Sequence, residues 1–130
     1  EIVGAGADRN REILATAKVS AASDCCVSSG GSSRKLEIMN DYKGYWSKYR
    51  RIDLRDDKFN KLGRENSIFL GVAPQEKKYV IIDFANNVNA KYIPSHFPYG
   101  YKPAYQIAIT QEQLKDLDFK AIAQEIASLL

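Results

Sequence analysis

The sequence predicts an α+β domain in which N-terminal helices precede a small antiparallel β-sheet and a C-terminal helix closes the fold. Two changes of pattern along the chain predict this order. Apolar and aromatic side chains recur at spacings of three and four up to Tyr49, whereas β-branched and aromatic runs start at Ser67. An apolar stripe at helical spacing then returns between Leu114 and Leu129.

The first 33 residues are expected to form a helical arm and a linker. Asp8 can cap a helix whose apolar side, over residues 13–21, is mostly alanine and would bury little area. Residues 23–33 are rich in serine and glycine, which predicts a flexible tether. We therefore divide the chain into an arm and linker, residues 1–33, and an α+β core domain, residues 34–130. The arm is expected to be dispensable for the stability of the core.

The core domain is expected to begin with two helices. Ser33 can cap the first helix, and one aromatic-rich face of it would be formed by Leu36, Met39, Tyr42, Trp46 and Tyr49. The segment 53–57 interrupts this periodicity. A short helix containing Phe59 and Leu62 is then expected to end at Gly63.

Strands are expected from Ser67 onwards. Residues 67–73 and 78–84 are separated by a turn-rich segment of hairpin length, so they should pair antiparallel. A short strand at 91–93 and an alternating strand at 104–109 are expected to follow. We expect the strands starting near residues 67, 78 and 104 to form one antiparallel sheet, covered by the 36–49 helix, with Trp46 buried, and by the C-terminal helix.

The C-terminal helix has two candidate starts. Thr110 and Gln113 have the spacing of a capping box. Asp118 offers a second start farther along the chain.

Composition and charge limit the classes of protein that fit. A chain of 130 residues with 45% hydrophobic and 27% charged residues is a globular domain of ordinary size. No apolar run approaches the roughly 20 residues that span a bilayer. The net charge is +3, and residues 34–64 carry ten basic and five acidic groups. That excess is typical of a surface facing an anion, and equally of a solvated helix face.

Cys25 and Cys26 are adjacent, which excludes an ordinary disulfide between them. Three interpretations of the two cysteines remain. They are inert small residues, they form an intermolecular disulfide, or they are reactive thiols. A cysteine nucleophile would have to be held about 3 Å from His96, which a Gly/Ser-rich linker does not favour. A zinc site would need unusual spacing, because the chain has one histidine and no CxxC pair. We therefore expect neither a metal nor another cofactor.

The densest group of polar and aromatic residues lies at 89–103. It contains the only histidine, His96, together with two lysines, three tyrosines and three of the four prolines. Histidine titrates near neutral pH and can act as a general acid or base. The simpler interpretation is that His96 is a loop residue and that the tyrosines pack against the sheet.

The chemical interpretation is cleavage of RNA without a metal. Internal attack by a 2′-hydroxyl needs a base, an acid for the leaving oxygen and a cation near the phosphate. The candidate catalytic residues are His96, Lys91, Tyr99, Tyr101 and Ser95. The candidate RNA-binding residues are Arg50, Arg51, Lys48, Lys102 and Trp46. A metal-dependent nuclease fits less well, because Glu76 and Lys78 fall in or beside a predicted turn.

A basic chain with leading helices, a small antiparallel sheet and a lone histidine in a Lys/Tyr/Ser setting resembles, over residues 34–110, the barnase, EndoU, colicin and RelE group of toxin ribonucleases. The resemblance rests on composition and layout. It implies RNA, transfer RNA included, as the substrate, a cognate inhibitor protein as a second partner, and action in the cytoplasm of a target cell. The absence of an initiator methionine and the linker-like front end suit an excised or delivered domain.

A second interpretation belongs to another class of function. The same aromatic loop could be presented to a protein by a non-enzymatic adaptor, immunity or effector domain, because Tyr, Trp, Phe and Arg are also favoured at protein interfaces. Immunity proteins that inhibit basic nucleases are expected to be acidic, whereas this chain is basic. The charge therefore favours the nuclease.

Overall fold

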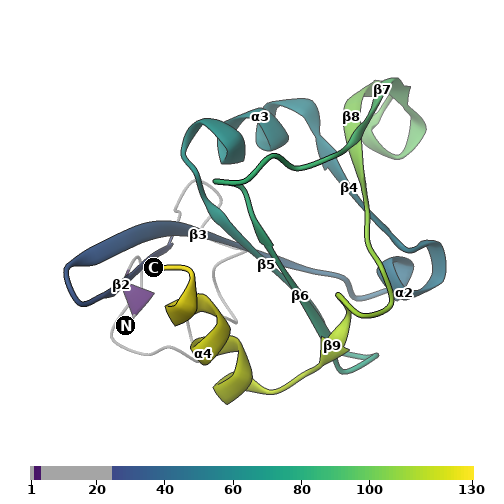
Figure 1. The fold of residues 1–130 in the computed structure, drawn as a ribbon. Helices are drawn as coiled ribbons and strands as arrows, with labels where there is room; N and C mark the ends of the chain where they lie inside the picture. The colour runs from purple at the N-terminus through teal and green to yellow at the C-terminus, as the bar shows by residue number, and fades with distance from the viewer. Residues whose placement is uncertain (1, 4–24) are drawn as a thin grey trace.

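The computed structural model describes residues 2–3 and 25–130, which form two β-sheets and a C-terminal helix (Figure 1). The six-stranded sheet has the order β1 (Ile2–Val3), β2 (Cys25–Ser29), β3 (Ser32–Asn40), β5 (Ile68–Ala73), β6 (Lys78–Asp83), β9 (Lys115–Asp116). The three-stranded sheet has the order β4 (Arg51–Arg55), β8 (Lys102–Ala108), β7 (Lys91–His96). The helices are α2 (Tyr45–Tyr49), α3 (Asp56–Arg64), the 3₁₀ turn η1 (Phe97–Tyr99) and α4 (Phe119–Ser128).

The predicted fold class is wrong, because strands dominate the described residues and the helix expected after Ser33 is largely a strand. β3 occupies Ser32–Asn40, and only the short α2 follows it. Leu36 and Ile38 are buried while their neighbours along the strand are not, which is a period of two. The apparent helical spacing joined side chains from a strand, a loop and a short helix. The helix expected at 8–21 lies outside the described residues.

The expected single antiparallel sheet is also wrong. β5 and β6 do pair antiparallel, but β3 pairs parallel with β5, with Leu36 opposite Ile68. β8 lies in the other sheet, antiparallel to β4 and to β7. The strand β4 was not expected, although its buried Ile52 and Leu54 alternate with three charged residues. β8 belongs to the second sheet because it forms its hydrogen bonds with β4 and β7.

Residues 25–33, which were expected to belong to a linker, form most of a hairpin. β2 and β3 pair antiparallel around Gly30 and Gly31, whose positive φ angles of 57° and 86° suit a tight turn. Cys25 and Val27 on β2 are buried. The hairpin therefore lies between β1 and β5 in the six-stranded sheet and contributes to its core.

α4 starts after Asp118, where the sequence allowed a restart, and not at the capping box of Thr110 and Gln113. The Asp118 carboxylate accepts hydrogen bonds from the backbone N–H groups of Lys120 and Ala121, at 3.0 and 3.3 Å. Thr110 and Gln113 make the reciprocal hydrogen bonds of a capping box, yet these bonds close a turn that leads into β9. A capping box alone does not propagate a helix, because an apolar face must be buried as well.

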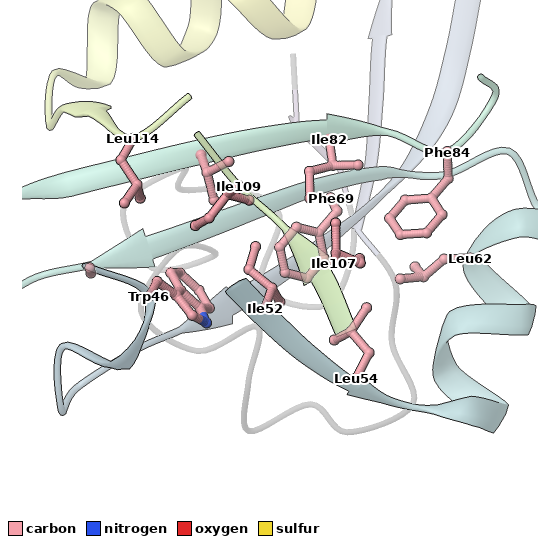
Figure 2. Packing of buried hydrophobic residues seen from close by; sticks show 12 residues of the cluster. Trp46, Ile52, Leu54, Leu62, Phe69, Ile82, Phe84, Ile107, Ile109 and Leu114 are labelled. Carbon is pink, nitrogen blue, oxygen red and sulfur yellow. The ribbon is translucent and has the colours of Figure 1, made fainter. Parts of the chain in front are cut away.

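The core has two parts, one on each face of the six-stranded sheet. β5 is buried at every position, with Ile68 and Leu70 facing α4 and Phe69 facing the three-stranded sheet. Between the two sheets lie Trp46, Ile52, Leu54, Phe69 and Ile107 among others (Figure 2). The six-stranded sheet is therefore the middle layer. Within the described residues, no helix has the length and apolar character needed to cross a membrane.

Candidate functional site

A cavity of about 420 Å³ opens between the end of β3, α2, β4 and η1. Its lining combines aromatic, cationic and carboxylate side chains. The lining residues are Met39, Asn40, Asp41, Tyr45, Trp46, Tyr49, Arg51, Asp53, His96, Pro98 and Tyr99. The single histidine of the chain therefore belongs to this cavity.

β4 positions two of the charged side chains. Because successive residues of a strand face opposite sides, the buried Ile52 and Leu54 point into the core and leave Arg51 and Asp53 on the cavity side. Arg51 Nε donates to Asp53 Oδ1 at 3.1 Å. The period of two that builds the strand thus also places an ion pair in the cavity.

His96 ends β7 and is 7% exposed. Its Nε2 lies 3.0 Å from Asp53 Oδ2, so the carboxylate sits between the imidazole and the Arg51 guanidinium. An ionised carboxylate only accepts hydrogen bonds, so Nε2 is the donor of this pair, and in the neutral form of the ring the lone pair lies on Nδ1. Nδ1 has no hydrogen-bond partner among the described residues, where no buried side-chain polar atom is left unpaired. Nδ1 therefore keeps some contact with solvent, although the residue as a whole is buried.

Tyr99 fixes η1 against β4. Its hydroxyl donates to the main-chain carbonyl of Asp53 at 2.5 Å, and its ring meets the His96 ring edge-on at 5.1 Å. Burial raises the pKa of Tyr99 and the nearby charge of Asp53 raises it further, against an opposing effect of Arg55. The phenol therefore stays protonated at neutral pH and remains a hydrogen-bond donor.

α2 forms an aromatic wall. Trp46 is 6% exposed and packs edge-on against Phe69, whereas Tyr45 and Tyr49 are about half exposed, with ring centroids 6.0 Å apart. Arg51 Cζ and Lys48 Nζ each lie 5.2 Å from the Tyr49 ring centroid. Exposed rings with cations beside them suit planar, electron-rich groups such as nucleobases.

A buried carboxylate and a glycine hold α2 in place. Asp41 accepts hydrogen bonds from the backbone N–H groups of Trp46 and Lys43, at 2.9 and 3.2 Å. A Cβ on Gly71 would lie 2.7 Å from Trp46 Cζ3, so the indole packs directly on the backbone of β5. The aromatic wall is thus anchored to the middle of the core.

The structure brings together four of the ten candidate residues from the sequence. His96, Tyr99, Arg51 and Trp46 line the cavity. Lys91, Ser95, Tyr101, Arg50, Lys48 and Lys102 do not. Ser95 Oγ instead donates to the main-chain oxygen of Tyr101 at 3.2 Å. Lys91 pairs with Gln106 at the other end of β7.

Sequence reasoning missed the residues that complete the cavity. Asp53, Asp41, Tyr45 and Tyr49 were not singled out as site residues. For Asp53 the signal was present, because charged and apolar residues alternate strictly from Arg51 to Arg55. The pairing of Asp53 with His96 had no such signal, since 43 positions separate the two residues.

The described residues contain no cluster of three or more His, Cys, Asp or Glu side chains that could hold a metal ion. Neither Cys25 nor Cys26 lines the cavity. The chain matches no protein-family model, and comparisons with curated proteins and with solved structures find no match either.

Proposed function

We propose that this chain is a metal-independent endoribonuclease domain of the toxin type that its sequence resembles, with His96 as the general base. The observation that carries the proposal is the pairing of His96 with Asp53 in a cavity that also has an arginine and an aromatic wall. A histidine oriented by a carboxylate is a recurring arrangement for proton transfer at neutral pH.

In the proposed reaction, an unpaired base stacks on the exposed rings of Tyr45 and Tyr49. His96 Nδ1 accepts the proton of the ribose 2′-hydroxyl, and O2′ attacks the adjacent phosphorus. The bond from phosphorus to O5′ breaks, which leaves a 2′,3′-cyclic phosphate and a 5′-hydroxyl. The leaving O5′ takes a proton from a solvent water, and His96 returns its proton to the hydroxide that remains. No oxidant, reductant or metal enters this balance.

Arg51 and Asp53 have separate roles. Arg51 uses Nε for Asp53, and its Nη groups have no hydrogen-bond partner among the described residues. They are suited to the phosphate oxygens, whose charge grows in the transition state. Asp53 holds the imidazole by Nε2 and stabilises the imidazolium that forms when Nδ1 takes the proton.

The test is cleavage of an end-labelled single-stranded RNA in the presence of EDTA. Fragments ending in 2′,3′-cyclic phosphate are expected, and the same sequence with 2′-O-methyl groups should remain intact because it has no attacking hydroxyl. His96→Ala should lower the rate by about 10²- to 10⁴-fold. Because His96 is buried, thermal unfolding of the variant must show that it still folds. A folded His96→Ala protein that cleaves as well as the parent overturns the proposal.

One observation favours a protein-binding function as the second candidate. Phe97 and Tyr101 are 71% and 65% exposed and lie outside the cavity, with ring centroids 5.4 Å apart. Exposed aromatic side chains of this kind are enriched at protein interfaces. If the chain neither binds nor cleaves RNA at low salt, this interpretation takes precedence. Substitution of Phe97 would then weaken binding of a protein partner, and substitution of His96 would not.

A further inference from the structure

Two exposed aromatic side chains lie in the turn that joins β7 to β8, at one end of the three-stranded sheet (Figure 1). Phe97 is 71% exposed and Tyr101 is 65% exposed, and their ring centroids lie 5.4 Å apart in an edge-to-face arrangement. Phe97 directly follows His96 in the chain, and Pro98 and Tyr99 of the same turn line the cavity. The aromatic pair, Phe97 and Tyr101, therefore lies beside the proposed active site without belonging to it.

Backbone hydrogen bonds fix the turn that carries the aromatic pair. The N–H of Tyr101 donates to the carbonyl of His96 at 3.0 Å, and the N–H of Gly100 donates to the carbonyl of Phe97 at the same distance. Gly100 and Tyr101 have left-handed φ angles of 66° and 64°. Tyrosine rarely adopts this conformation, and the Ser95 hydroxyl stabilises it by donating to the Tyr101 carbonyl at 3.2 Å. A fixed backbone lowers the entropy that is lost when a planar group binds to the two rings.

The charge next to the aromatic pair is positive. Lys102 is the only Lys, Arg, Asp or Glu in the segment 95–103. Its side chain is exposed, and among residues 2–3 and 25–130 no carboxylate pairs with it. Lys102 is opposite His96 in the register of β7 on β8, so it too lies near the proposed active site. Aromatic rings next to a cation are the combination that binds an unpaired base and its phosphate.

We propose that the aromatic pair stacks a base of single-stranded RNA beside the nucleotide that His96 attacks, and that Lys102 contacts the phosphate of the stacked nucleotide. The inference rests on the proposed function and deepens it by naming a second base-binding position on the same strand. The turn is continuous with the cavity through His96, so one strand can occupy both positions.

The size of the aromatic pair favours a base over a protein partner. A stable protein interface buries about 800 Å² on each partner. Here the exposed apolar surface is two side chains, with the exposed residues Ser95, Gly100 and Lys102 next to them in the chain. A single base needs only one aromatic face and gains about 1–3 kcal/mol from it.

The experiment measures binding separately from cleavage. The probe is a short fluorescent 2′-O-methyl oligonucleotide, which cannot be cut by attack of a 2′-hydroxyl. Its affinity is measured for the full chain, for Phe97→Ala and for the matched control Phe119→Ala. Phe119 is a 55% exposed phenylalanine at the start of α4 and does not line the cavity. Because both phenylalanines are exposed, both variants are expected to fold, which thermal unfolding checks.

Phe97→Ala should weaken binding about 5- to 150-fold, the effect expected for one stacked base. Phe119→Ala should bind like the parent. Phe97→Trp should restore binding and Phe97→Leu should not, because leucine keeps the apolar bulk but has no aromatic face. An oligonucleotide without a base at the stacked nucleotide should bind the parent more weakly, whereas Phe97→Ala should bind it as well as the intact probe.

The contact of Lys102 is measured by the salt dependence of binding. Lys102→Gln should lower the slope of log affinity against log salt by about 0.7, which corresponds to one phosphate for one cation. Lys120→Gln is the control, because Lys120 is an exposed lysine on α4. An unchanged slope for Lys102→Gln would overturn the phosphate contact.

The outcomes separate the stacking site from the proposed ribonuclease. Equal affinity of Phe97→Ala and Phe119→Ala, or of Phe97→Leu and the parent, overturns the stacking site even if the parent cleaves RNA. Binding that depends on the aromatic ring of Phe97, without cleavage of unmodified RNA, supports the stacking site and contradicts the ribonuclease. A parent that does not bind the probe at low salt overturns the stacking site and favours a protein as the partner of the aromatic pair.

Discussion

His96 reaches Asp53 across an intervening strand. His96 is the last residue of β7, and Asp53 is the middle residue of β4. The strand β8 lies between β7 and β4 in the sheet, yet His96 Nε2 is 3.0 Å from Asp53 Oδ2. The register of β7 on β8 shifts between Ile93 and His96. Such an irregularity bends a strand and redirects its side chains, which here turns the imidazole towards β4.

Asp53→Asn should lower the rate of RNA cleavage by about 10²- to 10⁴-fold with little change in KM. The amide can donate a hydrogen bond, so it no longer selects the ring form with a lone pair on Nδ1. Steady-state kinetics would separate kcat from KM. Asp116→Asn is the matched control, because Asp116 is an exposed carboxylate on β9 that pairs with Lys78. Equal kcat for Asp53→Asn and the control would contradict the role of Asp53.

Gly71→Ala should lower the free energy of unfolding by about 1–3 kcal/mol. The added methyl group would meet Trp46 Cζ3 at 2.7 Å and Val80 Cγ1 at 2.9 Å, both in the packed core. Urea unfolding followed by Trp46 fluorescence measures the effect. Gly63→Ala in α3 is the control, since nothing lies within 4 Å of its Cβ position. It should be neutral or stabilise by up to about 1 kcal/mol. Equal stability of the two variants would show that the indole can move away.

Asp83→Asn should remove part of the acid sensitivity of the fold. The hydrogen bond from Arg34 to Asp83 lowers the pKa of that carboxyl below its ordinary value of 3.8, against the opposing effect of burial. A lowered pKa in the folded state contributes stability above pH 3.8, which is lost as the pH falls through the folded-state pKa. The free energy of unfolding, measured with urea, should therefore differ most between the parent and the variant at neutral pH. That difference should narrow towards about pH 1–2, and a difference independent of pH would contradict this assignment.

Deletion of residues 1–33 should cost far more stability than deletion of residues 1–24. The longer deletion removes β2, whose Cys25 and Val27 are buried in the core between the six-stranded sheet and α4. Loss of the Val27 side chain alone is expected to cost roughly 1.5–3 kcal/mol. Thermal unfolding of the two truncated chains measures the difference. Similar thermal unfolding midpoints for the two truncated chains would support the domain boundary at residue 33 that the sequence predicts.

Local pattern was sufficient for some elements. The two runs that became β5 and β6 have strand-forming residues on both sides of a short turn, so their pairing joins segments that are close in sequence. Asp118 starts α4 because its carboxylate bonds to N–H groups only two and three residues away. The burial of Trp46 was also predicted correctly, because exposing so large an apolar side chain to water is unfavourable.

The sequence by itself thus determined the β5–β6 hairpin and the start of α4, whose stabilising contacts are local, and it determined the burial of Trp46 through the large apolar surface of that side chain. Only the tertiary structure decided the rest. Residues 34–40 fit a helix through Leu36 and Met39 and a strand through Leu36 and Ile38, and the strand prevails because β2 and β5 satisfy its hydrogen bonds on both sides. The His96–Asp53 pair exists for the same reason. Its geometry depends on strand pairing between distant segments, and spacing along the chain carries no record of which strands will meet.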